Sequence, residues 1–230
     1  MAFQPIVDVS TRSVYAYEAL VRGPGGESAA SVLSNVTLAN KFLFEQSCRR
    51  KSIEQAAALG MATRLSINFL PSAIQDADGC LGLTLSTADR CGFPLHHLMF
   101  EVVEGENYTD IDHVKTIFQS YRNRGFTTAI DDFGAGFAGF GAIIEMHPHV
   151  VKIDMSLIRN IDKAVRKQIV VGGIVAICSG LGARPLAEGV ETFAEFQSLR
   201  KLGIDLFQGF WFARPSFNAL PEVAWLDLHR

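Results

Sequence analysis

The feature that most constrains the fold is a regular alternation of short apolar runs with longer segments along the 230 residues. Each run has strand length and is rich in Val, Ile, Leu or Phe, and most are separated by enough chain for a helix. The runs cover residues 3–9, 15–21, 64–70, 98–104, 127–133, 150–155, 184–190 and 206–212. Alternating strands and helices predict a parallel sheet with right-handed crossovers.

The first connection departs from this pattern. The chain from Asp8 to Val14 is too short for a parallel crossover, which requires a dozen or more residues. We therefore expect the first two strands to form an antiparallel hairpin that turns near Ser10, followed by seven parallel strands. The predicted fold is α/β, a modified TIM (β/α)8 barrel with an antiparallel first strand. The length fits one such barrel, so residues 1–230 are expected to form a single domain.

Two segments between the runs have clear helical character. Residues 110–124 carry apolar side chains at three- and four-residue steps, and Gly125 follows as a stop signal. Residues 169–178 are the most apolar stretch, but they are about half the length of a membrane span, so a buried helix is expected there. We expect no membrane segment and no secretory leader, and the strand-like start suggests a domain cut from a longer protein.

The net charge limits the classes of binding partner, and the cysteines indicate the cellular compartment. The formal net charge of −3 gives no sign of the basic surface that would bind duplex DNA. A nucleotide ligand is still compatible, because metal ions can neutralise phosphate where a protein supplies carboxylates. The four cysteines form no C-x-x-C pair, and we expect them to be free thiols of a cytoplasmic protein rather than disulfides.

Polar side chains occur late in seven of the apolar runs. In α/β barrels the carboxyl ends of the strands meet at one opening, where active sites are built. A single acidic residue at such a position commonly caps the next helix, but carboxylates from many strands repel one another unless cations are present. The residues concerned are Glu18, Asn68, Glu101, Glu104, Asp131, Asp132, Lys152, Asp154, Glu188 and Gln208, and Glu191 comes just after the seventh run.

The donor types indicate which ions such an opening would hold. Oxygen ligands without His or Cys favour Mg²⁺ or Mn²⁺ over zinc. Asp131 and Asp132 are adjacent, which suits a site for two ions. Neighbouring strand residues point to opposite faces, so both can reach one site only if the strand bends at its end.

These residues lie in motifs that resemble a known family. The segment Y-E-A-L-V-R contains Glu18 and Arg22, and it is followed in order by S-I-N-F-L, F-E-V-V-E, D-D-F-G, K-I-D, A-E-G-V-E and Q-G-F. Together they resemble the EAL-domain family of cyclic di-GMP phosphodiesterases, with most similarity to the branch that includes blue-light-sensor-linked members. The resemblance implies a TIM-like barrel that hydrolyses cyclic di-GMP to linear pGpG with Mg²⁺ or Mn²⁺, two ions per site.

By resemblance, each motif residue has an expected role. The expected ligands of the first metal are Glu18, Asn68, Glu101 and Asp131, and those on the side of the second metal are Asp132 and Asp154. Lys152 is similar to the lysine beside the attacking water, Glu188 to the proposed general base or metal-water ligand, and Glu104 to the glutamate that steadies the loop after the fifth strand. The expected substrate contacts are Gln4, Leu20, Arg22, Glu191 and Gln208.

The loop after the fifth strand departs from the pattern of many active relatives. Ala135, Phe137, Ala138 and Gly139 replace residues that often carry hydroxyl groups, which reduces local side-chain hydrogen bonding. By resemblance, this loop places Asp132 and takes part in dimer contacts. The family also implies a homodimer, and a sensory domain that is fused to the chain or regulates it.

Three functional classes remain open from the sequence. The first is an active phosphodiesterase, which is favoured because every expected metal ligand and Lys152 are present. The second is a dinucleotide receptor or protein-antagonist surface that uses the same barrel without turnover. The third is a TIM-barrel enzyme with another metal-dependent substrate, which fits the acidic opening but not the ordered motifs. For Arg22, a surface ion pair is the alternative to a phosphate contact.

Overall fold

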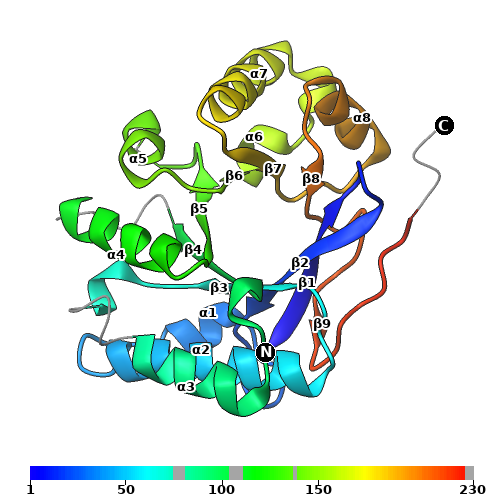
Figure 1. Cartoon of the computed structure of the whole chain (residues 1–230). Coiled ribbons are helices and arrows are strands. Elements are labelled where there is room, and N and C mark those ends of the chain that lie inside the picture. The colour runs from blue at the N-terminus through cyan, green and yellow to red at the C-terminus, as the bar shows by residue number, and fades with distance from the viewer. Residues whose placement is uncertain (75–80, 104–110, 137–138, 226–230) are drawn as a thin grey trace.

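The strands of this computed structural model, which describes residues 1–74, 81–103, 111–136 and 139–225, form one sheet that closes on itself (Figure 1). Strands β2 to β8 are parallel neighbours in chain order, and β1 closes the barrel by pairing antiparallel with both β2 and β8. The predicted barrel and its antiparallel first hairpin are confirmed. The strands are β1 Ala2–Asp8, β2 Ser13–Leu20, β3 Arg64–Asn68, β4 Leu98–Val103, β5 Thr127–Phe133, β6 Val150–Ile153, β7 Arg184–Ala187, β8 Leu206–Phe207 and the short β9 Ser216–Phe217.

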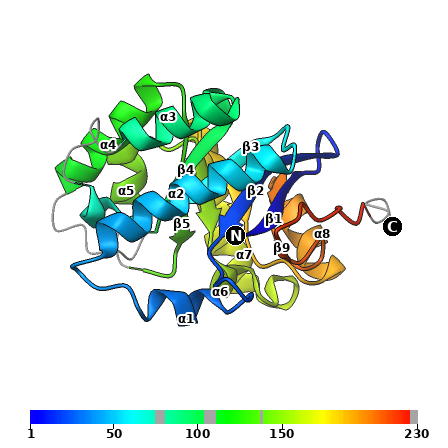
Figure 2. The same cartoon turned by 90° about the horizontal axis from the view of Figure 1, so that it is seen from below.

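Helices surround the barrel, as the two perpendicular views show (Figures 1 and 2). The α-helices are α1 Ala29–Leu33, α2 Lys41–Ala58, α3 Gly82–Cys91, α4 Ile111–Asn123, α5 Gly139–Met146, α6 Met155–Ile158, α7 Val165–Gly180 and α8 Phe193–Lys201. Single 3-10 turns occur at Pro71–Ala73, Leu95–His97 and Ile161–Lys163. The helix expected at 110–124 corresponds to α4. None of the described helices combines the length and the apolar character needed to cross a bilayer.

Three of the last strands end earlier than the sequence suggested. The run at 206–212 forms strand only at Leu206–Phe207, because the chain then turns at Gly209 against the loop after β7. A Cβ on Gly209 would lie 2.1 Å from the carbonyl oxygen of Val190, so no other residue fits this close approach. Likewise β7 ends at Ala187, and β6 ends at Ile153 because Asp154 caps α6.

The barrel interior is layered. One apolar layer takes a side chain from every strand from β1 to β8 except β3: Ile6, Ala16, Met99, Ala129, Val150, Leu186 and Leu206. At the end that carries the β1–β2 turn, the Tyr15 ring lies 4.5 Å from the Arg64 guanidinium and 5.2 Å from that of Arg184, which also pairs with Asp8 at 2.7 Å. The alternating residues of the same strands pack outward against the helices in the larger core.

Helix α7 is not the buried helix that its composition predicted. Val171, Ile174 and Cys178 are buried, but Val165, Ile169, Val170 and Ile177 are exposed. The apolar composition therefore predicted the helix correctly, but the prediction that the helix is buried is wrong. Three free cysteines, at positions 48, 91 and 178, agree with the expectation of thiols, and Cys80 lies outside the described residues.

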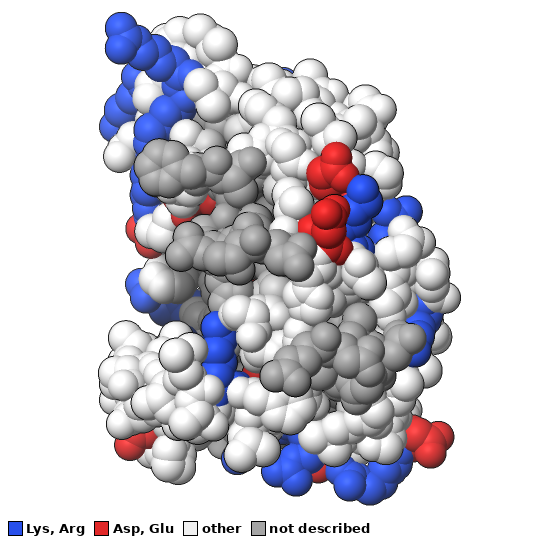
Figure 3. Space-filling model, turned by 90° about the vertical axis from the view of Figure 1, so that its left-hand side faces the viewer, with Lys and Arg blue, Asp and Glu red and all other residues white. Residues whose placement is uncertain are grey.

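Charged side chains are distributed over the surface in small groups. On the face seen from the left of Figure 1, basic side chains lie in several separate groups between uncharged ones (Figure 3). Among the described residues, a few ion pairs are deeply buried, and one of them lies inside helix α2.

Helix α2 is fixed to the barrel by a buried cation. The Arg49 guanidinium lies 5.1 to 5.8 Å from the ring centroids of Phe69, Phe100 and Tyr121, and Arg49 pairs with Glu45 one turn earlier. Both side chains are almost inaccessible, at 1% and 3%. Burial raises the pKa of Glu45 in spite of the neighbouring Arg49. Burial lowers the pKa of Arg49, but Tyr121 and Glu45 outweigh this effect and raise it. The buried pair therefore fixes this turn of α2 against the three rings.

We expect Glu45→Ala to lower the free energy of unfolding by about 3–5 kcal/mol, because it leaves the Arg49 charge buried without an acidic partner. The matched control is Glu54→Ala on the same helix, where Glu54 and Arg90 are 40% and 62% exposed. That change should cost no more than about 1 kcal/mol. Urea denaturation of both variants measures the difference, and equal losses would contradict the buried-pair interpretation.

Candidate metal centre

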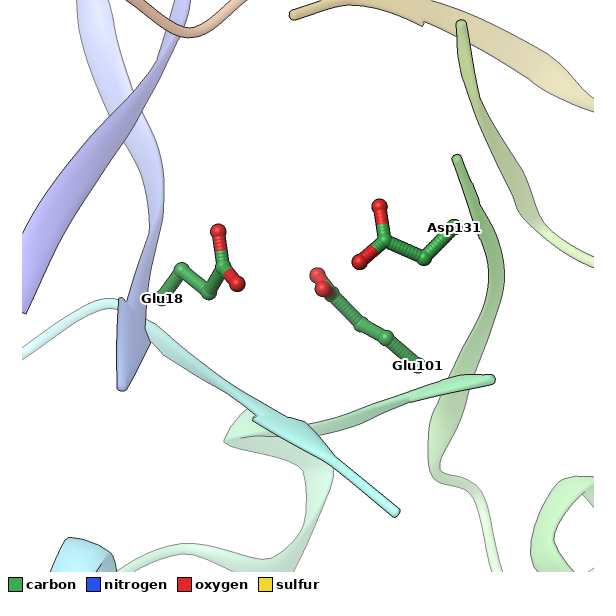
Figure 4. A group of neighbouring side chains, drawn as sticks. All are labelled: Glu18, Glu101 and Asp131. Carbon is green, nitrogen blue, oxygen red and sulfur yellow. The ribbon is translucent and has the colours of Figure 1, made fainter. Parts of the chain in front are cut away.

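Three carboxylates from three separate strands meet inside the barrel mouth. Glu18 comes from β2, Glu101 from β4 and Asp131 from β5, and their side chains point toward one another (Figure 4). One oxygen of each lies within 4.8 Å of the others, and all three residues are buried. They lie on inward-facing positions one layer above the apolar layer, because strand residues two apart share a face: Glu18 follows Ala16, Glu101 follows Met99 and Asp131 follows Ala129.

Lys152 of β6 lies at the centre of this group and is completely buried. Its Nζ lies 2.7 Å from Glu101 Oε2, 2.9 Å from Asp131 Oδ1, 2.9 Å from Glu188 Oε1 and 3.5 Å from Glu18 Oε2. An ammonium has three hydrogens, so it can satisfy three of these carboxylates and not the fourth. One positive charge among four carboxyl groups leaves an excess of negative charge.

The pKa values of the group follow from burial and from this crowding. Burial disfavours the Lys152 ammonium, but the carboxylates, led by Asp131 and Glu101, raise its pKa well above the usual value. Burial raises the pKa of Glu101 to about 8, with Glu18 and Asp131 adding to the effect and Lys152 opposing it. The pKa of Glu188 is raised for the same reasons, burial first and Asp131 second. In the absence of bound cations, protons on Glu101 and Glu188 therefore neutralise part of the excess negative charge.

A second carboxylate group shares Asp131 with the first. Asp131, Asp132 and Glu188 also place one oxygen each within 4.8 Å of one another. Asp132 reaches the mouth because its backbone is left-handed, with φ of 53°, and the β5–β6 register shifts between Ile130 and Phe133. This is the bend that two adjacent strand residues need in order to face one site. The pKa of Asp132 is raised to about 6 by burial and by Asp131.

Uncharged polar side chains hold the first group in place. Asn68 donates to Glu18 Oε1 at 2.9 Å, and Gln208 donates to Glu18 Oε2 at 2.7 Å. Gln208 also lies 3.4 Å from Gln4 Oε1, so two expected substrate contacts are part of the same network. The Ser66 hydroxyl donates to Glu101. Sequence reasoning missed Ser66, because a lone serine within a strand gives no signal.

Other expected site residues lie at the rim or away from it. Asp154 accepts a hydrogen bond from Ser156 N at 2.9 Å as the cap of α6, and it lies outside both carboxylate groups. Glu191 pairs with Arg159, which the sequence analysis did not identify. Arg22 donates to the adjacent Val21 carbonyl at 2.7 Å.

Two hollows adjoin the carboxylates. One, of about 430 Å³, is lined by Glu18 and Asp131 of the first group, by the whole second group, and by rim residues from the loops after β6, β7 and β8. The other, of about 270 Å³, is mostly apolar and lies beside α1 and α2, with Leu20 and Asn68 in its wall. Arg22 lines neither hollow among the described residues. Glu104, Phe137 and Ala138 lie outside the described residues.

The donor set fits hard divalent cations. Carboxylate oxygens and an amide oxygen, from Asn68, are the ligands that Mg²⁺ and Mn²⁺ prefer. Because Asp131 belongs to both carboxylate groups, it is placed to bridge two ions. The residues present therefore fit the two metals expected from the sequence.

Comparison with known proteins gives a consistent result. The EAL domain family matches residues 1–215. The antirepressor BluF of Escherichia coli, regulated by blue light and temperature, is 29% identical over 225 residues, which are 97% of this chain and 56% of BluF. The cyclic di-GMP phosphodiesterase PA2567 of Pseudomonas aeruginosa is 28% identical, with 96% of this chain and 38% of that protein covered. The chain thus spans little more than half of BluF and less of PA2567.

Solved structures agree closely in fold. A standalone versatile EAL protein from Vibrio cholerae O395, in its c-di-GMP bound form, is 47% identical with a TM-score of 0.95, covering 97% of this chain and 94% of that one. A manganese/cy-diGMP complex of BlrP1 from Klebsiella pneumoniae is 32% identical with a TM-score of 0.92, covering 97% of this chain and 57% of that one.

We expect Mn²⁺ binding to release protons at neutral pH, because the raised pKa values of Glu101 and Asp132 keep part of the site protonated. Affinity should therefore rise as the pH is increased from about 6 to about 8. Calorimetric titration at one pH, in two buffers with different ionisation enthalpies, counts the protons released. Identical heats in both buffers would show that no proton leaves and would contradict the raised pKa values.

Proposed function

The chain belongs to the EAL domain family, and we propose that it is a metal-dependent phosphodiesterase that hydrolyses cyclic di-GMP to linear pGpG. The observation that carries this proposal is the buried Lys152 among four carboxylates at the mouth of the barrel. A receptor that only binds a dinucleotide has no need for a buried cation held against so many acidic groups. Further support comes from solved relatives of similar fold that contain c-di-GMP, one of them with manganese.

The residues at the mouth of the barrel would bind two metal ions. Glu18, Asn68, Glu101 and Asp131 would hold the first ion, and Asp132 and Asp154 would lie on the side of the second. Bound divalent ions lower the pKa of a water and neutralise charge on a phosphodiester. Mg²⁺ or Mn²⁺ is the proposed cofactor, while the larger Ca²⁺ binds with looser geometry and supports turnover poorly.

Lys152 and Glu188 perform the proton chemistry. The carboxylates keep Lys152 charged, and cations bound to those carboxylates would free ammonium hydrogens to orient the attacking water and to stabilise the negative charge that develops on the phosphoryl oxygens. Glu188, made more basic by burial, accepts a proton from that water. The water oxygen then forms a bond to phosphorus as one phosphorus–oxygen ester bond breaks. The ring opens, and the departing oxygen takes up a proton from solvent to become a hydroxyl of the linear product, while Glu188 releases the proton that it accepted.

A second candidate function is a receptor or antagonist without turnover. Its support is the similarity to BluF, which is an antirepressor. The altered loop after β5 also favours slower chemistry, because Ala135 and Gly139 lack the hydroxyls that such a loop often carries. The two functions differ in one measurable outcome, which is whether bound dinucleotide is cleaved.

Regulation through a partner copy fits the exposed face of α7. Along this face Val165, Ile169, Ile177 and Leu181 are exposed, with Gly173 at the midpoint. Ile169 and Ile177 lie four positions on either side of Gly173, and Val165 and Leu181 lie eight. A two-fold axis at Gly173 would therefore pair each large apolar residue with another in an antiparallel helix contact. The glycine lets the two helices approach closely. We propose a homodimer across α7, on which a fused or separate sensory domain would act.

We expect the purified chain with Mn²⁺ to convert cyclic di-GMP to pGpG, and chelator to abolish this conversion. Glu18→Ala should lower turnover at least about a hundredfold, because it removes a metal ligand in a site where preorganised charge supplies most of the rate. Glu54→Ala, on the exposed side of α2, is the control. Product chromatography measures all three, and binding without cleavage by the unaltered chain would favour the receptor.

We expect Ile169→Glu to convert a dimer into a monomer, because it places two like charges in the apolar helix contact near Ile177 of the other copy. Sedimentation velocity or light scattering measures the mass. Arg50→Glu, at an exposed position of α2, is the control for a change of charge alone. A monomeric unaltered chain at micromolar concentration, or a dimer that survives Ile169→Glu, would contradict the contact.

A further inference from the structure

Helix α6 has only four residues, yet it begins directly after one of the expected metal ligands. The Asp154 side chain caps the helix by accepting from Ser156 N at 2.9 Å, which uses one of its two carboxylate oxygens. Asp154 also lines the 430 Å³ hollow together with Asp132 and Glu188. A helix of one turn has few hydrogen bonds of its own, so the position of Asp154 depends on what fixes α6 from outside.

Lys167 of α7 fixes the end of α6. Its Nζ donates to the carbonyl oxygen of Ser156 and, at 2.7 Å, to the carbonyl oxygen of Arg159. The last carbonyls of a helix have no partner within it, so these two bonds supply what α6 itself cannot. Both views place α6 beside α7 (Figures 1 and 2). Ser156 therefore contacts Lys167 through its oxygen and Asp154 through its nitrogen, and it links the two side chains directly.

The position of Lys167 is not explained by α7 itself. The first turn of α7 contains Arg166 and Lys167 and no acidic residue. The N-terminus of a helix carries a partial positive charge, which disfavours cations there. The Lys167 ammonium is instead paired with carbonyls that precede the helix in the chain. The contribution of this side chain is therefore made to α6 and not to α7.

A buried carboxylate from α8 holds the same segment from another side. Glu195 is 3% exposed, and its Oε1 accepts from Asn160 N at 2.9 Å, just after the end of α6. Its Oε2 accepts from Glu191 N and Thr192 N in the loop after β7, at 3.1 Å each. The segment that follows Asp154 is thus attached through its carbonyls to α7 and through an amide to α8.

We propose that Lys167 is a positioning residue for the second metal ion, because it holds the end of α6 and so sets where the Asp154 carboxylate lies in the mouth. This inference rests on the proposed function and adds a residue that none of the motifs contains. Without the Lys167 ammonium the one-turn helix is free to shift, and Asp154 shifts with it. Groups that orient a metal ligand typically contribute about 10- to 100-fold to metal affinity.

A purely structural role for Lys167 is the competing explanation, and the same turn of α7 offers a matched control. Gln168 donates from Nε2 to Ile161 O at 2.8 Å, so it also joins α7 to the segment before it. Its acceptor lies in the 3-10 turn beyond the end of α6. Gln168→Leu therefore removes a comparable bond without releasing α6. Lys167→Arg retains the charge and a donor for each of the two carbonyls.

Calorimetric titration of the full chain with Mn²⁺ tests this role apart from turnover. The unaltered chain should bind two ions. Lys167→Met should weaken the second on the order of tenfold or more, and unchanged binding of the first would show that the variant is folded. Lys167→Arg should restore the affinity, and Gln168→Leu should match the unaltered chain. In turnover, Lys167→Met should lower kcat with little change in KM for cyclic di-GMP, and a higher Mn²⁺ concentration should recover the rate.

Two ions held as tightly by Lys167→Met as by the unaltered chain would overturn the positioning role. Equal losses in Lys167→Met and Gln168→Leu would overturn it as well, because they would indicate a general loss of stability. An unaltered chain that binds two Mn²⁺ ions but leaves cyclic di-GMP intact would instead overturn the proposed function. The calorimetric comparison would still decide the role of Lys167, so the two failures are distinguishable.

Discussion

The crowding of four carboxyl groups around one ammonium is the constraint on which the rest of the structure depends. Lys152 is fully buried and has Glu18, Glu101, Asp131 and Glu188 around it. Removing so many ionisable groups from water is costly, and one cation does not neutralise them. A fold can hold such a cluster only if its backbone is rigid at each attachment point. Neighbouring strands of a closed barrel meet this requirement, because every strand is hydrogen-bonded on both sides.

Much of this arrangement was predictable from the sequence because strand geometry leaves few choices. Glu18, Glu101 and Asp131 each occur late in an apolar run, and a parallel barrel brings the carboxyl ends of such runs to one opening. The antiparallel first hairpin followed from the length of one connection. The bend that turns Asp132 into the mouth was required by the adjacency of two acidic residues, and it appears as the positive φ.

Two kinds of feature were not predictable from the sequence. One is a contact between residues that lie far apart in the chain, and the other is the environment of a helix face. Arg159 and Glu191 are 32 positions apart, so neither residue signals the other. Ser66 supports Glu101 from the next strand without any pattern of its own. The exposed face of α7 was invisible for another reason. Hydropathy reports that a side chain avoids water, but it does not distinguish the chain's own core from the surface of another chain.

Helix α6 connects the metal side of the mouth to its rim, although it has only four residues. A Cβ on Gly134 would lie 2.5 Å from a methyl group of Leu157, and one on Gly189 would lie 2.7 Å from the Cβ of Met155. Both glycines have positive φ, so the loops after β5 and β7 press against α6 where no side chain fits. Those loops follow Asp132 and Glu188 directly, and the helix itself ends at Arg159. A displacement of α6 would therefore move the segments that carry Asp132, Glu188 and Arg159 together.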